Sequence, residues 1–249
     1  MDGQNIEKLS QYMEYVEKLP KEFSLSRGQS KDYKLLPSAL RKDEAGNRKY
    51  TRRAVNNFLT NFRVNSYQYM ENPWDVNSDI EWMLHAQHYG IPTKLMDFTT
   101  SHITSLLFSV EKAFSDKDES DAVIYFLDPC ALNSKNAKQS QIITVDGSDK
   151  IKSDEHDGPV AIQVRKLNSR INAQNGLFVL FQDADDELVK GLDEDIIKKV
   201  TIKGDAKRDI LSSLYTMGVT FSNIYPELTS VAKDIVTQQD INEYLREQE

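Results

Sequence analysis

The chain has 249 residues, of which 39% are hydrophobic and 28% are charged, and its formal net charge is −8 at pH 7. This composition is typical of a soluble globular protein with a full hydrophobic core. The acidic balance argues against a broad phosphate-binding surface, such as that of a protein that coats duplex DNA.

Membrane and secreted classes are also disfavoured. No stretch approaches the roughly 18 consecutive apolar residues that a membrane-spanning helix needs, and the first residues lack the apolar segment of a secretory signal. The single cysteine, Cys130, excludes an internal disulfide and fits a reducing compartment. We therefore expect a cytoplasmic protein with no membrane partner.

The N-terminal part is predicted to hold two helices with a strand between them. Residues 5–19 and 51–71 carry apolar side chains at helical spacing. Residues 23–29 alternate apolar and small polar side chains, which predicts a strand that ends in a tight turn near Arg27 and Gly28. An arginine can hold a phosphate or carboxylate through two hydrogen bonds, and a glycine lets a backbone approach a ligand closely.

A run of charges precedes the second of these helices. Residues 41–53 contain six Lys or Arg, interrupted by Asp43 and Glu44. Such runs are usually solvated. The pattern therefore favours a solvated loop and helix start, and a local basic patch is the alternative.

Residues 78–110 are the most informative stretch. Apolar residues recur at helical spacing until a Gly-x-Pro sequence at residues 90–92, where the helix should end. Residues 93–98 then read as a short strand. A second helix is predicted to follow, capped by Thr100 or Ser101.

Two polar residues of this stretch fall where burial is expected. Gln87 shares the apolar face of the first helix, and Asp97 lies in the strand between Met96 and Phe98. A buried polar group without a partner costs on the order of 1–3 kcal/mol, so both should be hydrogen-bonded. One interpretation is a clamp that ties the turn to the second helix, and the residues alone favour it. The other is a ligand-facing cluster beside a helix N-terminus, where anions bind readily.

The part of the chain that follows residue 110 is predicted to contain strands and helices without strict alternation. Strands are expected at residues 122–127, 160–164, 177–181 and 196–203, and helices at 205–217, 221–228 and from 231 onwards. The polar, acidic residues 133–158 are predicted to form a long loop outside the body, with one short strand around 142–145. We expect an α+β fold: a single mixed domain over residues 1–249, with a central, largely antiparallel sheet flanked by helices.

The familiar catalytic signatures are missing from the sequence. His85 and His88 lie one helical turn apart, but no third metal ligand is evident from spacing, so structural histidines are favoured and no metal is expected. Cys130 has no histidine near it in the sequence that would mark it as a nucleophile. No GxGxxG, GxxxxGK[ST] or GxSxG motif occurs.

A family resemblance rests on residues 86–99, which read AQHYGIPTKLMDFT. This segment is similar to the core motif of the FRG domain family, which is usually close to AQHxGxPTRLLDWT. The motif that names the family, an aromatic residue followed by Arg-Gly, has its counterpart in residues 26–29, SRGQ, with serine in the aromatic position. Residues 170–178, RINAQNGLF, also resemble the family pattern. The resemblance covers approximately residues 20–236 and implies one FRG-type domain from a bacterial or phage accessory gene, in a defence or toxin context.

A more remote similarity connects this pattern with ADP-ribosyltransferases of the Arg-Ser-Glu type. Arg27-Gly28 and the segment from Thr99 to Ser101 look like partial counterparts of the arginine and Ser-Thr-Ser segments of those enzymes. Gln174 stands in motif order where they carry a glutamate, and a glutamine cannot supply the negative charge that stabilises an oxocarbenium-like transition state. The resemblance therefore implies an NAD-like pocket more directly than it implies transfer.

The leading hypothesis is a polar pocket that binds a nucleotide such as NAD, with ADP-ribosyltransferase-like activity as its extension. The expected ligand-binding residues are Arg27, Gly28, Gln29, Gln87, Asp97, Thr99 and Ser101, and the expected catalytic residues are Gln174 and His88. The alternative is a non-enzymatic interaction domain that recognises a protein or a nucleic acid. In that case the same residues would hold the fold, and Arg27 would form a structural pair with Asp97 or a glutamate.

Overall fold

The computed structural model describes residues 4–70, 72–114, 119–146, 156–165 and 177–248. Within these ranges the helices are α1 (Leu9–Lys18), α2 (Arg52–Ser66), α3 (Asp79–His88), α4 (His102–Val110), α5 (Pro129–Ala137), α7 (Lys207–Thr216), α8 (Phe221–Ile224) and α9 (Leu228–Arg246). Short 3-10 helices are η1 (Ser38–Leu40), η2 (Tyr67–Tyr69) and η3 (Pro73–Asp75). The strands are β1 (Gln4–Ile6), β2 (Leu25–Gln29), β3 (Leu95–Phe98), β4 (Ala122–Leu127), β5 (Ile143–Val145), β6 (Val160–Val164), β7 (Leu177–Leu180) and β8 (Ile197–Ile202).

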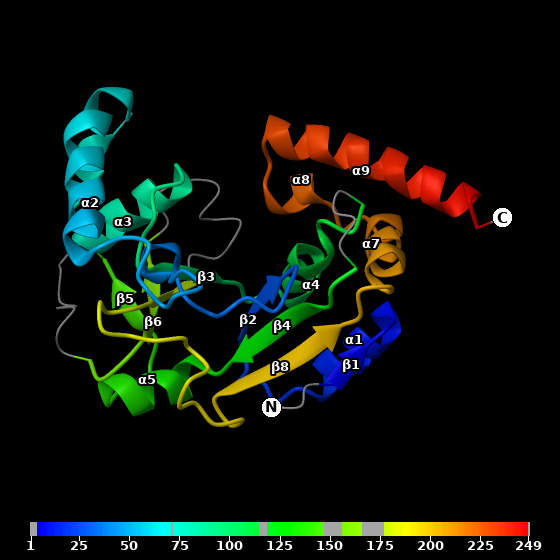
Figure 1. Ribbon diagram of the computed structural model, residues 1–249, viewed down its shortest axis with the longest axis horizontal. Coiled ribbons are helices and arrows are strands. Elements are labelled where there is room, and N and C mark those ends of the chain that lie inside the picture. Colours follow the sequence, from blue (N-terminus) through cyan, green and yellow to red (C-terminus); the bar gives the residue numbers. More distant parts are fainter. Residues whose placement is uncertain (1–3, 71, 115–118, 147–155, 166–176, 249) are drawn as a thin grey trace.

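The strands form two four-stranded sheets, in the orders β1-β8-β4-β2 and β3-β7-β6-β5. Pairing is antiparallel except for β1 with β8 and β5 with β6. An isolated bridge between Ser26 and Thr99 links the sheets. Figure 1 shows the second sheet below α2 and α3 on the left, and the first sheet running across the centre towards α1, α4 and α7. The predicted α+β class is confirmed, with the expected central sheet divided in two.

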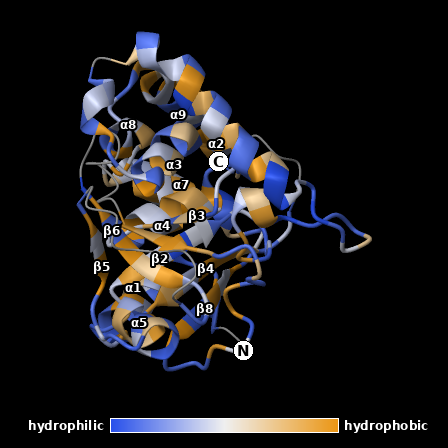
Figure 2. Cartoon of the chain, turned by 90° about the vertical axis from the view of Figure 1, so that its left-hand side faces the viewer, coloured by the Kyte–Doolittle hydropathy of each residue, from blue (hydrophilic) through white to orange (hydrophobic). Residues whose placement is uncertain are grey.

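The first sheet is buried on both faces. Alternate residues of β4 point to opposite sides, as the period of a strand requires. Ile124 and Phe126 join the core formed with α1, α4, α7 and α8, whereas Val123, Tyr125 and Leu127 join a core formed with the second sheet and the loop before η1. All six residues of β4 are buried, which explains its continuous apolar sequence. Figure 2 shows this concentration of hydrophobic residues along the central strands.

Helix α4 lies unusually close to β2. A Cβ atom on Gly28 would stand 1.8 Å from the carbonyl oxygen of Ser105 and 3.0 Å from the amide nitrogen of Ser109. The missing side chain therefore admits the backbone of a helix. The close approach that the glycine allows is thus to α4, and the role of Gly28 beside a ligand stays a prediction.

The helix ends within residues 78–110 form as predicted. Ser78 caps α3 in a reciprocal capping box with Glu81, and Gly90 takes a φ of +85° after the helix ends. Ser101 is the N-cap of α4, and its side chain accepts from the amide of Thr104.

Two elements depart from the sequence expectation. Residues 4–6 form a strand, where a helix was predicted from residue 5, because they pair in parallel with residues 200–202. The expected loop over 133–158 is wrong at its start, because α5 occupies residues 129–137. The carboxylate of Asp128 caps this helix and Pro129 occupies its first turn. None of the described helices combines the length and apolar character that a bilayer crossing requires.

Gly28→Ala should destabilise the protein strongly. The new Cβ must push α4 away from β2, and overpacking of this kind costs about 1–3 kcal/mol or more, so we expect a loss at the upper end of that range. Gly46→Ala is a control, because Gly46 has a φ of +83° and open space around it. Only the left-handed backbone cost of about 1 kcal/mol is expected there. Chemical denaturation measures both, and equal losses would contradict the importance of the α4–β2 contact.

Candidate functional site

A cavity of ≈ 310 Å³ lies beside β2, the end of β3 and α4. Of the residues expected to bind a ligand, Arg27, Gly28, Gln29, Asp97 and Thr99 line it. These residues come from two different sheets. The structure therefore brings most of the predicted set together at one opening.

The sheet junction explains why a cavity forms here. Ser26 and Thr99 exchange both backbone hydrogen bonds, at 2.8 and 2.9 Å. Beyond this bridge β2 continues along β4, while β3 continues along β7. The strands therefore diverge, and side chains next to the bridge face the space between them.

Arg27 is the main cationic group at this junction. Its Nη1 donates to the carbonyl oxygen of Asp97 at 2.8 Å and lies 3.9 Å from the Asp97 carboxylate. Its Nε–H is buried and has no hydrogen-bond partner among the described residues. Burial lowers the pKa of the guanidinium below its usual value, and Asp97 opposes that effect. An arginine still remains charged at physiological pH.

Asp97 is less enclosed than the sequence predicted. Its side chain is 47% exposed, and one carboxylate oxygen accepts from Nε2 of Gln87 at 2.8 Å. The expected bond from Gln87 is confirmed, whereas the expected burial is wrong. The side chain is exposed because it lines the cavity.

Gln87 belongs to an internal clamp. Its amide donates to Asp97, and its carbonyl oxygen accepts from the hydroxyl of Thr93. The Thr93 hydroxyl oxygen also accepts from the amide of Leu95, and the Thr93 amide donates to Ser38. Gln87 therefore joins α3, the turn and β3, whereas the clamp interpretation expected a tie between the turn and the second helix. The clamp and the cavity meet at Asp97.

The other expected site residues have separate roles or positions. Ser101 caps α4 and is not among the described residues that line the cavity. His88 ends α3 with its ring 4.8 Å from that of Tyr89, and it too is outside that lining set. Gln29 donates from its side chain to the carbonyl of Tyr33 at 2.8 Å. Gln174 lies outside the described residues.

A hydrogen-bonded chain at the back of the cavity was missed by the sequence reasoning. Ser26 Oγ lies 2.8 Å from Nδ1 of His102 and 2.8 Å from Oγ of Ser105. The carbonyl of His102 accepts from the hydroxyl of Tyr12 at 2.7 Å. Burial lowers the pKa of His102, so its ring is neutral near pH 7. No local sequence motif predicts these hydrogen bonds, because Ser26 and His102 are far apart in the sequence.

Several further lining residues come from distant segments. Arg41, which the sequence placed in a solvated run, lines the cavity while remaining exposed. Tyr33, Phe108 and Tyr225 supply rings, and the rings of Phe108 and Tyr225 lie 5.8 Å apart. Aromatic residues at these positions carry no pattern that periodicity detects.

No group of metal ligands accompanies the cavity within the described residues. His85 lies against the ring of Trp82, and burial and the neighbouring His88 lower the pKa of His85. This environment is typical of a structural histidine.

Thr93→Val should break the clamp while preserving the shape of the side chain. Thr93 is 2% exposed, so valine would leave the Leu95 amide and the Gln87 carbonyl oxygen without this hydroxyl partner. We expect a loss of about 1–3 kcal/mol in the free energy of unfolding. Thr144→Val, on an exposed position of β5, should change it by less than about 0.5 kcal/mol. Equal melting temperatures of Thr93→Val and wild type would show that the clamp does not stabilise the protein.

The half-buried histidines His85 and His102 predict a loss of stability in mild acid. The pKa of His102 is lowered from 6.5 in the folded state, as is that of His85, so the unfolded state binds more protons just below pH 6.5. The free energy of unfolding should therefore fall as the pH drops from about 6.5 towards the folded pKa values. His102→Gln should flatten this slope in urea titrations between pH 7.5 and 5, and an unchanged slope would show that His102 does not contribute.

Comparison with known families gives one match. Residues 24–118 match the family model described as the FRG domain. This range contains β2, β3 and α4, which line the cavity, and it is narrower than the range expected from the motifs. No curated protein and no solved structure matched the chain. The chain therefore carries an FRG domain over residues 24–118.

Proposed function

We propose that the cavity beside Arg27 binds a phosphorylated nucleotide of the NAD type. The observation that carries this proposal is the buried Nε–H of Arg27, which lacks a partner among the described residues. An unsatisfied buried donor costs about 1–3 kcal/mol, and a phosphate oxygen in the cavity would satisfy it. The planar guanidinium matches phosphate geometry through two parallel hydrogen bonds.

The charges around the cavity favour an anion. Arg27, Arg41 and Lys112 all line it, in a chain whose net charge is −8. Glu111, one of the two carboxylates that line it, pairs with Lys233 at 2.9 Å. The positive groups therefore outnumber the carboxylates, which raises the local concentration of anionic ligands.

The size and walls of the cavity fit one nucleotide unit. Ligand cavities usually measure about 300–1,000 Å³, so ≈ 310 Å³ is at the lower end. The remainder of a dinucleotide would extend out of the opening. The rings of Tyr33, Phe108 and Tyr225 are available for contact with a base or a nicotinamide ring.

We extend this proposal from NAD binding to the transfer of ADP-ribose from NAD to an acceptor. The bond between nicotinamide and the ribose C1 would break, with nicotinamide taking the bonding electrons. An acceptor nucleophile would then add to C1 and lose its proton. The Asp97 carboxylate, which lines the cavity and is half exposed, is positioned to stabilise the positive charge that develops on the ribose. Such transfer would suit the defence or toxin context that the family resemblance implies.

Arg27→Lys tests the binding site directly. Lysine keeps the charge but loses the planar fork, so affinity for NAD, ADP-ribose and AMP should fall at least tenfold in calorimetry. Adenosine, which lacks phosphate, should bind weakly to both proteins. Arg246→Lys, at an exposed arginine near the end of α9, should leave the affinities unchanged.

The variant must melt near the wild-type temperature for this comparison to hold. If calorimetry detects no binding of these ligands to the wild type, the proposal is wrong. The alternative of a non-enzymatic interaction domain would then remain. Incubation of wild type with labelled NAD and a cell extract tests transfer separately. Binding without labelled macromolecules would limit the function to recognition.

A further inference from the structure

Exposed aromatic side chains are concentrated at one end of the molecule. Tyr67, Tyr69, Trp74 and Tyr89 are 40%, 82%, 79% and 68% exposed, and they lie on or next to η2, η3 and α3. Among the described residues, Tyr33 is the only other exposed aromatic side chain. Solvent-exposed rings in such a group usually mark a binding surface.

Three of these rings, Tyr67, Trp74 and Tyr89, belong to a continuous row. Trp74 contacts Tyr67 at 5.7 Å between ring centroids, and Tyr67 stacks on the buried Trp82 at 5.5 Å. Trp82 contacts Phe62 at 6.4 Å, and Phe62 contacts Tyr89 at 6.0 Å. The row is anchored in the middle and exposed at Trp74 and Tyr89. The end rings are therefore held in place by packing.

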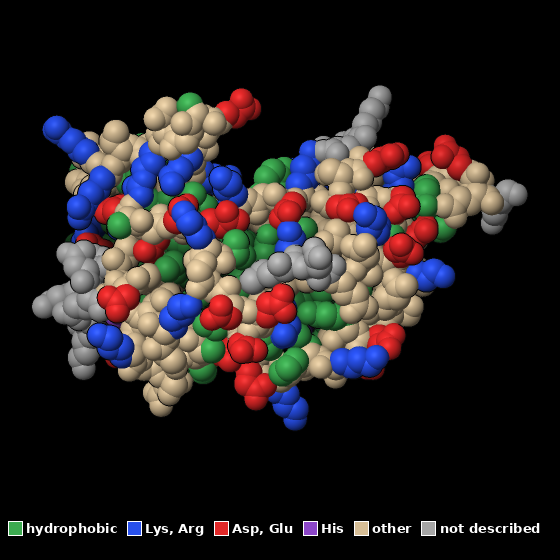
Figure 3. All heavy atoms as spheres, turned by 60° about the horizontal axis from the view of Figure 1, so that its bottom comes forward, with side chains coloured by type: hydrophobic (Ala, Val, Ile, Leu, Met, Phe, Trp, Pro, Cys, Tyr) green, Lys and Arg blue, Asp and Glu red, His purple; other side chains and the backbone are tan. Residues whose placement is uncertain are grey.

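Helix α2 and the loop before it carry an excess of positive charge, whereas residues 67–89, which hold the exposed rings, contain four Asp or Glu and no Lys or Arg. Residues 41–66 contain seven Lys or Arg and two Asp or Glu, whereas the whole chain has 31 and 39. Arg63 lies 5.4 Å over the Trp82 ring and pairs with Asp79 at 2.6 Å, whereas Arg53 is exposed and forms no ion pair with a described residue. Figure 3 shows Lys and Arg side chains gathered at the upper left, at the end of the molecule that carries α2.

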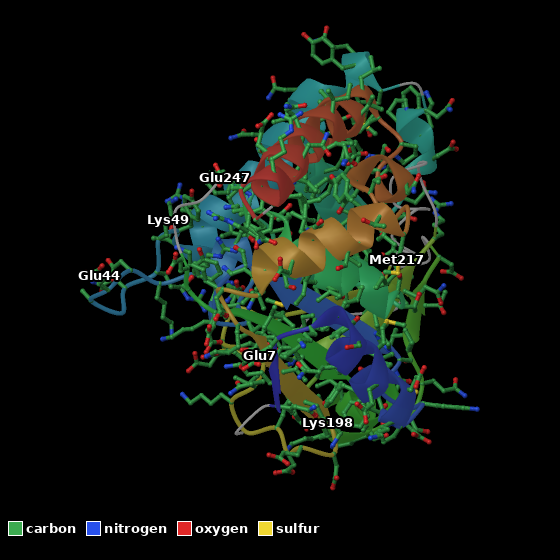
Figure 4. The ribbon with its side chains drawn as sticks, turned by 90° about the vertical axis from the view of Figure 1, so that its right-hand side faces the viewer. Glu7, Glu44, Lys49, Lys198, Met217 and Glu247 are labelled. Atoms are coloured by element: carbon green, nitrogen blue, oxygen red, sulfur yellow. The ribbon has the colours of Figure 1, made fainter. Side chains whose placement is uncertain are left out.

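The loop before α2 extends this charged region outward. Figure 4 shows Glu44 at the tip of a loop that stands away from the body, with Lys49 nearer its base. Lys49 lies 5.3 Å over the ring of Tyr50, which contacts Phe58 of α2 edge-on at 5.1 Å. Contacts between a cation and a ring therefore lie just before α2, at Lys49 and Tyr50, and near its end, at Arg63 and Trp82. The helix spans roughly 22 Å at 1.5 Å per residue.

We propose that this aromatic-basic face, defined by Arg53, Arg63, Tyr67, Trp74 and Tyr89, binds single-stranded nucleic acid. Unpaired bases stack on exposed rings, and phosphates are attracted to the neighbouring guanidinium groups. A duplex keeps its bases stacked on one another, so it could not use the rings. The acidic remainder of the chain would repel nucleic acid elsewhere, which favours this one face.

This proposal goes beyond nucleotide binding in the cavity. None of the five residues that define the face is among those lining the cavity next to Arg27. A strand held along α2 would make the protein a recognition module for nucleic acid, whether or not the cavity binds a nucleotide.

Fluorescence anisotropy with a fluorescein-labelled oligothymidylate, and with an RNA of the same length, tests the proposal. Trp74→Ala should weaken binding at least fivefold, because one stacking ring is lost. Arg53→Ala should weaken binding and reduce the slope of log affinity against log salt by about 0.7. Leu228→Ala and Arg246→Ala remove exposed side chains far along the sequence and should change neither quantity.

Tryptophan emission provides a second measurement. The chain has two tryptophans, of which Trp74 is 79% exposed and Trp82 is fully buried. Oligonucleotide binding should quench the wild-type emission, and Trp74→Ala should abolish that quenching. Arg27→Lys should change neither the anisotropy nor the quenching of tryptophan emission. The binding of nucleic acid to this face can therefore be disproved without disproving nucleotide binding in the cavity, and the reverse.

Three results would overturn the proposal. The first is no anisotropy change with DNA or RNA at low salt. The second is a duplex that binds as tightly as the single strand, with affinity unchanged by Trp74→Ala. The third is capture of a protein partner by the wild type, but not by Trp74→Ala, without any oligonucleotide binding, which would assign the face to a protein.

Discussion

The single bridge between Ser26 and Thr99 is the constraint on which the site depends. Two backbone hydrogen bonds at this point are the link between two sheets that otherwise pair with different strands. If β2 and β3 paired along their whole length, Arg27 and Asp97 would lie in one continuous sheet. Because they diverge instead, their side chains face a cavity. The divergence of the two sheets thus creates the cavity, and the side chains that line it determine its chemistry.

Helix α4 holds this junction in place through contacts of three kinds. Gly28 lets its backbone approach β2, Ser105 meets Ser26 through their hydroxyl groups, and the backbone amide of Ser101 donates to the hydroxyl of Thr99 at 3.0 Å. Each contact is short and local, so small shifts of the helix would disturb all three. The rigid side of the cavity is therefore the helix, whereas Tyr33 and Arg41 reach it from irregular segments.

Much of the fold could be predicted because its elements are strongly periodic. Residues 122–127 form a strand with the predicted bounds, and the joints around α3 and α4 follow capping chemistry. β1 could not be predicted, because three residues show no periodicity and their partner lies far along the chain. For the site, Arg27 and Asp97 were found through motif chemistry. His102 was missed because only the folded chain brings it to Ser26.

The pairing of β1 with β8 has a consequence for synthesis of the protein. Gln4 lies opposite Val200, so the edge of the first sheet cannot close until residue 200 has left the ribosome. At about 5–20 residues per second, this delay is roughly 10–40 s. Ile6 and Tyr12, which are fully buried in the finished protein, must remain without their final cover during that time. These two side chains therefore gain their full cover only after residue 202 has emerged.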